Sequence, residues 1–180
     1  PLIEADINLL KMYTGKILSG ANTLVDELGF KKAYICVKRK HSSVVEKLAS
    51  TIKSKNTELF LLDDFYPAGD EHVLVYETTK RIVPEGGLPL NVGCVVLNVE
   101  TLFNVCNAIE GIPVTDTYLT IKGEVPNPVT LRLPVGTRIS DALKIAGLEC
   151  MEGKKVIEGG PMMGKLVDNL DIPVIKTTKA

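Results

Sequence analysis

Residues 66–101 have the sequence YPAGDEHVLVYETTKRIVPEGGLPLNVGCVVLNVET, which is the least ordinary part of the chain. It follows an apolar run over 58–62 that predicts a buried strand. A Pro-Ala-Gly turn and two adjacent carboxylates, Asp70 and Glu71, come next. They precede a helical pattern over 72–80, so an expected strand ends in a polar turn at the start of an expected helix.

The same order recurs later in the stretch. A Gly/Pro-rich loop over 84–89 leads to a second apolar run, 95–97, which predicts another strand. This run ends in Asn98, a residue type that favours the N-cap of a following helix. In open α/β sheets, ligands bind at the carboxyl ends of strands, where helix N-termini offer backbone N–H groups. The pattern therefore predicts a binding site here.

The composition is that of a soluble globular protein. The 180 residues are 45% hydrophobic and 24% charged, with a formal net charge of -1. This balance gives no basic field for nucleic acid or an anionic membrane. No apolar run approaches the roughly 20 residues that a membrane span needs, and no secretory signal is visible.

Four cysteines are widely spaced, at Cys36, Cys94, Cys106 and Cys150. They form no C-x-x-C pair and no cluster with histidine, so the sequence contains no metal or iron–sulfur spacing. Cysteines in apolar runs predict reduced thiols in a cytoplasmic protein. The sequence also lacks G-x-S-x-G and H-E-x-x-H, which argues against a hydrolase or a metalloenzyme.

The first half of the chain predicts an α/β fold. The spacing of apolar residues over 3–28 predicts a helix with one apolar face. Gly15 and Gly20 weaken its middle, so a break or close packing is expected there. A strand over 33–37, a helix opened by the capping box from Ser43 to Glu46, and the strand over 58–62 then form a βαβ unit.

The character of the sequence changes near 112–115, where alternating and turn-rich patterns begin. The expected elements are strands over 117–122 and 129–133, a helix over 139–146 and a strand over 155–157, followed by a tight turn at 159–164. This ββα(β) order predicts a small β-grasp module. The tail, 172–180, is expected to be an exit strand or a linker.

Each candidate site residue has two interpretations. Asp70 and Glu71 either offset the helix macrodipole or accept hydrogen bonds from a nucleotide. Gly69 would allow close backbone approach of a phosphate or a flavin edge, and Tyr66 would stack on a ring or pack under the turn. Asn98 would cap its helix or bond a ring carbonyl. The basic run Lys38-Arg39-Lys40-His41 is either a solvated turn or a phosphate or partner contact.

Four motifs together resemble one family. They are Tyr66–Glu71, Val83–Pro89, Asn98–Thr101 and Gly159–Gly164, in this order and at these distances. They are similar to the C subunit of the Rnf electron-transport complex and its soluble relatives, namely the cobalamin reductase of propanediol utilisation and the electron-transfer protein of proline reductase. More distantly, they resemble the NADH-oxidising flavin subunit of respiratory complex I.

The resemblance implies a partial Rossmann-like α/β domain that binds FMN and NADH, followed by a soluble-ligand-binding β-grasp (SLBB-type) domain. The implied domains are 1–112 and 113–168, with 169–180 as a linker towards an iron–sulfur domain. The implied cofactor-binding residues are Tyr66, Gly69, Asp70, Glu71 and Asn98. No catalytic residue and no metal ligand is implied within this sequence.

The resemblance also places two of the family's modules outside this sequence. A glycine-rich flavin loop would lie upstream of Pro1, and a [4Fe–4S] domain would follow Lys176–Thr178. We therefore expect this piece alone to bind FMN weakly or not at all, and to be inactive. The intact protein would be an NADH-dependent oxidoreductase, cytoplasmic or held at a membrane by partner subunits.

The expected function is electron transfer from NADH through FMN to iron–sulfur clusters and a downstream acceptor, with other electron-transfer subunits as partners. The alternative is a non-catalytic binding or assembly module, whose β-grasp half docks a partner or a small ligand. Leu97 favours this alternative, because the complex I relative has an Asn there. A weaker third idea is a nucleotide transferase with a metal held by Asp63, Asp64 and Asp70.

Overall fold

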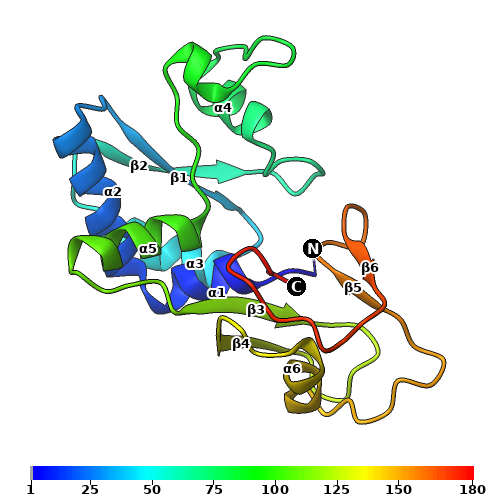
Figure 1. Ribbon diagram of the computed structural model, residues 1–180. Coiled ribbons are helices and arrows are strands. Elements are labelled where there is room, and N and C mark those ends of the chain that lie inside the picture. The colour runs from blue at the N-terminus through cyan, green and yellow to red at the C-terminus, as the bar shows by residue number, and fades with distance from the viewer. Residues whose placement is uncertain (1) are drawn as a thin grey trace. The chain divides into compact units, whose positions relative to one another are not determined.

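The computed structural model describes residues 2–180. The chain contacts divide it into two compact units (Figure 1). Residues 10–106 form one of them, here called the α/β unit. The other, here called the β-grasp unit, comprises residues 2–9 and 107–180. No helix formed by residues 2–180 has the length and apolar character that crossing a bilayer requires.

The predicted βαβ unit is confirmed. Strand β1 (Ala33–Lys38) pairs in parallel with β2 (Thr57–Leu62), and α3 (Ser42–Thr51) connects them. The predicted capping box is wrong, because α3 begins one residue earlier. The carbonyl of His41 accepts the first helical N–H groups, and no side chain caps the helix.

The expected helix over 3–28 is two helices, α1 (Ala5–Met12) and α2 (Thr14–Leu28). The break falls at Tyr13 and not at a glycine. Close packing at Gly20 is confirmed, since a Cβ added there would lie 2.0 Å from Sγ of Cys106. Cys106 belongs to α5 (Val99–Ile109), so α2 and α5 approach each other at a position where only glycine fits.

The second expected strand, over 95–97, is wrong. Residues 94–98 have no regular structure and join the short helix η1 (Pro89–Val92) to α5. Val95 and Leu97 are 50% and 43% exposed. The sheet of the α/β unit has only β1 and β2 among the described residues. An apolar run becomes a strand only where a neighbour pairs its backbone groups.

The β-grasp unit confirms the expected hairpin and helix. Strand β3 (Asp116–Ile121) pairs antiparallel with β4 (Val129–Pro134), and α6 (Ile139–Ile145) packs on them in one apolar core. Strand β5 (Val156–Glu158) pairs with β6 (Lys165–Val167), which the sequence did not predict. The tight turn at 159–164 connects these two short strands.

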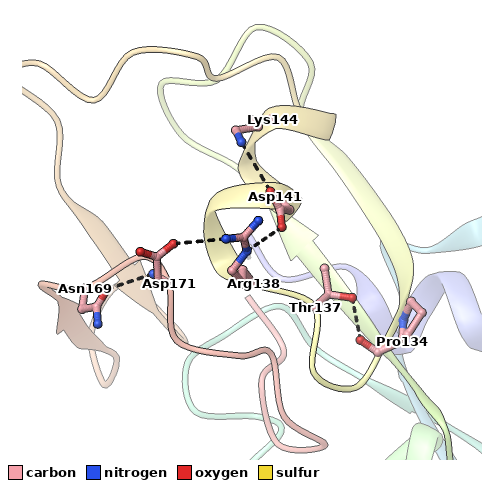
Figure 2. A network of polar contacts seen from close by, with 7 residues as sticks. All are labelled: Pro134, Thr137, Arg138, Asp141, Lys144, Asn169 and Asp171. Carbon is pink, nitrogen blue, oxygen red and sulfur yellow. Dashed lines mark hydrogen bonds and ion pairs between the residues drawn. The ribbon is translucent and has the colours of Figure 1, made fainter.

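The tail is part of the β-grasp unit. Ser140 and Ile139 donate backbone hydrogen bonds to the carbonyls of Leu170 and Ile172, and Gly136 donates to Val174. Val174 is completely buried. Figure 2 shows Arg138 between Asp141 and Asp171, which adds an exposed ionic link between α6 and the tail.

The contacts therefore place residues 107–112 and the tail with the β-grasp unit. The sequence instead assigned residues 1–112 to the first domain and 169–180 to a linker. Those family-based domain limits stay a prediction.

Candidate functional site

The turn after β2 displays a tyrosine. Residues 63–70 leave the end of β2 and lead into α4 (Glu71–Thr79), which Figure 1 shows on the side of the sheet away from α3 and α5. Ala68, within this turn, is buried. The Tyr66 side chain is 66% exposed, and its hydroxyl makes no hydrogen bond within the described residues. Tyr66 is therefore available for stacking and does not pack under the turn.

Asp70 caps α4. Its side chain accepts the backbone N–H of His72 at 2.9 Å and of Val73 at 3.4 Å. The carboxylate thus occupies the amides that a helix N-terminus would otherwise offer to an anion. A ligand phosphate at this end of α4 would meet a negative charge. Of the two interpretations, the structure bears out helix capping for Asp70.

Gly69 and Glu71 flank this cap and remain open. A Cβ added at Gly69 would meet no atom within 4 Å, and its backbone is outside the left-handed region. The fold therefore does not require glycine there. Glu71 is exposed and has no hydrogen bond or ion pair within the described residues. Both positions face solvent, so both suit contact with a ligand.

Asn98 is exposed directly before α5. Its backbone carbonyl accepts the N–H of Leu102 at 3.0 Å, but its side-chain amide makes no hydrogen bond in the described part of the chain. The predicted side-chain cap is therefore not formed. No hydrogen bond between described residues joins Asn98 to the 66–71 turn, so the structure leaves these two parts of the predicted site without a direct link.

The Gly86-Gly87 loop is held in place by polar contacts. Leu88 donates its backbone N–H to Oδ1 of Asn91 at 2.7 Å, and Arg81 donates to the carbonyl of Val92 at 2.7 Å. These contacts support an ordered connection. Sequence reasoning missed Arg81 and Asn91. The sequence did contain a signal for Asn91. It lies three residues after Leu88, which is the spacing at which a polar side chain can accept the N–H of a helix N-cap residue.

The basic run after β1 is paired with acids after β2. Lys38 and Lys40 each lie 2.9 Å from a carboxylate oxygen of Asp64, and Arg39 lies 3.1 Å from Asp63. The hydrogen bonds from Lys40 and then Lys38 lower the pKa of Asp64 to about 2. These ion pairs lie at the exposed ends of two parallel strands, where three basic side chains share two carboxylates. The aspartates offset part of the positive charge that the basic run would present to a phosphate.

The geometry does not support the idea of a nucleotide transferase that holds a metal through Asp63, Asp64 and Asp70. Asp63 and Asp64 are engaged by basic side chains, and Asp70 is engaged by backbone amides. Within residues 2–180, no three His, Cys, Asp or Glu side chains are grouped to hold a metal ion. Burial raises the pKa of the Cys36 thiol to about 11, which keeps it protonated and unreactive at neutral pH.

Three exposed polar side chains of the α/β unit have no hydrogen bond or ion pair within the described residues. They are the Tyr66 hydroxyl, the Glu71 carboxylate and the Asn98 amide. Together they offer donors and acceptors of the kind that an isoalloxazine ring and its ribityl hydroxyls use. The amides at the start of α4 are not open to a phosphate, because Asp70 occupies them.

Comparison with known proteins gives a consistent result. The model of the Nuo51 FMN-binding domain matches residues 1–107, and the model of the SLBB domain matches residues 118–166. The chain is 36% identical over 179 residues to the cobalamin reductase PduS of Citrobacter freundii, covering 99% of this chain and 40% of that protein.

A second relative belongs to a multi-subunit complex. The chain is 33% identical to the C subunit of the proton-translocating ferredoxin:NAD(+) oxidoreductase complex of Clostridium ljungdahlii, covering 98% of this chain and 39% of that protein. The chain thus spans about 40% of the length of these relatives.

A solved structure supports the fold. An NAD+-reducing [NiFe]-hydrogenase in its H2-reduced state superposes with a TM-score of 0.73 at 22% identity, covering all of this chain and 37% of that one. Because the FMN-binding model covers more than half of the 180 residues, the chain belongs to the family of the Nuo51 FMN-binding domain, here followed by an SLBB domain.

Proposed function

We propose that this chain is the flavin-binding portion of an NADH-dependent electron-transfer protein, which passes electrons to [4Fe–4S] clusters outside the chain and then to a partner subunit or reductase. The observation that carries the proposal is the match of the FMN-binding domain over residues 1–107. A relative named as a cobalamin reductase supports electron transfer to an acceptor, and one named as a subunit of a ferredoxin:NAD(+) oxidoreductase complex supports electron exchange with NAD(H).

When bound, FMN accepts the two electrons of a hydride and releases them one at a time. The residues of this chain would hold and orient the reactants. The exposed ring of Tyr66 would stack on a planar ring, and the open surface over Gly69 would allow that ring to approach the backbone. The free Glu71 and Asn98 side chains would bind polar groups of the flavin or the nicotinamide.

Asp70 would act as a positioning residue. Its bonds to the amides of His72 and Val73 fix the first turn of α4, which carries Glu71. They also place a negative charge that disfavours phosphate at this helix end. The phosphate of FMN would therefore be held elsewhere, in agreement with the glycine-rich loop that the resemblance places upstream.

The second candidate function is a binding or assembly module without catalysis. The exposed Leu97 side chain, at a position where the complex I relative has an Asn, favours it. So does the occupation of the α4 amides by Asp70, because a helix end closed in this way offers no anion site. The two proposals differ in whether NADH oxidation depends on the exposed polar residues of the α/β unit.

The test is NADH-dependent dye reduction by the protein extended through the upstream flavin loop. Glu71→Gln and Tyr66→Ala are compared with two matched controls, Glu46→Gln on α3 and Tyr76→Ala on α4, whose side chains are also exposed. If the protein transfers electrons, Glu71→Gln and Tyr66→Ala should each lower the rate or the apparent FMN affinity at least about tenfold. A loss of this size corresponds to roughly one strong hydrogen bond. Absence of NADH oxidation in the unsubstituted protein would favour the assembly module.

A further inference from the structure

Arg81 joins the two parts of the candidate site. It follows α4, the helix that the 66–71 turn leads into, and its guanidinium reaches the end of η1. Its Nη1 donates to the carbonyl of Val92 at 2.7 Å and lies 3.9 Å from Sγ of Cys94. A few residues further along the chain, the same segment ends at Asn98. Arg81 therefore connects the helix that carries the turn with the segment that carries Asn98.

The turn that ends α4 sets the direction of Arg81. Lys80 closes the helix in the left-handed conformation, with φ 59, and is the one residue other than glycine among residues 2–180 with a positive φ. The N–H of Lys80 donates to the carbonyl of Tyr76 at 2.8 Å, and the N–H of Arg81 donates to the hydroxyl of Thr79 at 3.2 Å. An uncommon backbone conformation persists where the surrounding contacts require it. These contacts fix how the chain leaves α4 and hence where the Arg81 side chain begins.

The carbonyl of Val92 is an acceptor that η1 does not satisfy by itself. The carbonyls of Pro89 and Leu90 accept the N–H of Gly93, which ends η1. No backbone N–H in the described part of the chain donates to Val92. The last carbonyls of a helix need partners, and a cationic side chain is a favourable one. Arg81 thus caps the C-terminus of η1.

The segment between η1 and α5 is held at its two ends. The backbone of residues 95–97 makes no hydrogen bond with any other residue of the described chain. At one end, the carbonyl of Asn98 accepts the N–H of Leu102 at 3.0 Å. At the other end, Arg81 bonds Val92. Because no hydrogen bond holds the chain in between, a displacement of η1 would be passed on to Asn98.

We propose that Arg81 is a positioning residue, which sets where Asn98 lies relative to the 66–71 turn. This role rests on the proposed function, in which Asn98 and the turn bind the same ring system. Two contacts with one rigid ligand reinforce each other when their separation is fixed before the ligand binds. Arginine suits this task because its guanidinium is planar and always charged, so its bond to Val92 does not depend on pH near neutrality.

The experiment is a double-mutant cycle on the protein extended upstream through the flavin loop. Arg81→Met, which keeps an unbranched apolar side chain but no donor, and Asn98→Ala are made singly and together. FMN affinity is measured by fluorescence quenching, and NADH-dependent dye reduction is measured alongside it. Arg138→Met is the matched control, because it removes an exposed arginine of the β-grasp unit. Hydrogen exchange reports on the N–H groups of Gly93 and Cys94, which bond to carbonyls of η1.

We expect Arg81→Met and Asn98→Ala each to weaken FMN binding roughly threefold to tenfold, the value of about one hydrogen bond. Because Arg81 acts through Asn98, the double variant should bind FMN no more weakly than Asn98→Ala alone. Arg81→Lys, which keeps a cationic donor, should recover part of the affinity. Exchange at residues 93–94 should be faster in Arg81→Met and unchanged in Arg138→Met.

Four results would overturn the positioning role. They are unchanged FMN binding in either single variant, losses that multiply in the double variant, unchanged exchange at residues 93–94, and failure of Arg81→Met to fold in a thermal melt. With FMN binding and NADH oxidation intact in the unsubstituted protein, each of these leaves the proposed function standing. Absence of both activities in the unsubstituted protein would overturn the proposed function and, with it, the role of Arg81.

Discussion

The carboxylate of Asp70 accepts the backbone N–H of His72 at a distance of 2.9 Å. This bond closes the N-terminus of α4 from within, at the place where the sequence suggests either a helix cap or a nucleotide contact. The consequence is a division of roles along this turn. Asp70 serves the helix, while Tyr66, Gly69 and Glu71 on either side of it remain free for a ligand.

Replacing Asp70 by alanine should destabilise the α/β unit by about 1 kcal/mol, the usual value of a lost N-cap. Asp70→Ser should retain most of that stability, because a hydroxyl oxygen can accept the same amides. Urea denaturation followed by circular dichroism measures both variants. Equal stability of Asp70→Ala and the unsubstituted chain would show that the cap is not formed in solution.

Gly20→Ala should destabilise the α/β unit by roughly 1–3 kcal/mol, as expected for overpacking. Its Cβ would lie 2.0 Å from Sγ of Cys106, inside the contact of α2 with α5. Gly15→Ala is the control in the same helix, since a Cβ there meets nothing within 4 Å. It should be neutral or stabilising by up to about 1 kcal/mol. A double variant with Cys106→Ala should recover part of the loss at Gly20, and failure to do so would contradict the close contact.

The ion pairs at the ends of β1 and β2 should respond to acid. The pKa of Asp64 is lowered from 3.8 to about 2 by Lys40 and Lys38. A lowered pKa in the folded state means that the pair stabilises the fold above the ordinary pKa, and that this contribution disappears as the pH falls through about 2. Carboxyl chemical shifts measured by NMR should titrate near this value. Lys40→Met should move the midpoint upwards, whereas an ordinary midpoint in the unsubstituted chain would refute the pairing.

The tail should contribute to the stability of the β-grasp unit. Val174 is fully buried, whereas the neighbouring Ile175 is 48% exposed. Val174→Ala should lower the free energy of unfolding by roughly 2 kcal/mol through lost methyl contacts and a small cavity. Ile175→Ala should change it by less than about 0.5 kcal/mol. Thermal or chemical melts of the two variants measure these changes. Equal changes in the free energy of unfolding for Val174→Ala and Ile175→Ala would mean that the tail is a linker, as the sequence suggested.

Local patterns predicted the elements whose periodicity is strong. Alternation indicated the β3–β4 hairpin, and the order of strand, helix and strand indicated the parallel pair β1–β2. The run at 95–97 failed because apolar character does not say whether a neighbouring strand is present to pair with it. The burial of Val174 was missed because it depends on contacts with α6, about 30 residues away, which no local pattern records.

The candidate site shows the same limit. Residue types identified Tyr66, Gly69, Glu71 and Asn98 as candidates, and all four are accessible in the structure. Their types did not reveal that Asp70 is occupied by its own helix, because aspartate serves equally well as a cap and as a ligand contact. Nor did they reveal that Asp63 and Asp64 form ion pairs with the basic run at the end of β1, since that pairing depends on the register of two strands.

We propose that the α/β unit forms part of an FMN pocket. The most direct measurement is FMN titration by fluorescence quenching, on the 180-residue chain and on the protein extended upstream through the predicted glycine-rich loop. We expect tight binding by the extended protein, weak or no binding by the chain alone, and a loss of affinity in Gly69→Ala without a loss of stability. Absence of FMN binding by both proteins would contradict the flavin pocket and leave the assembly module as the better account.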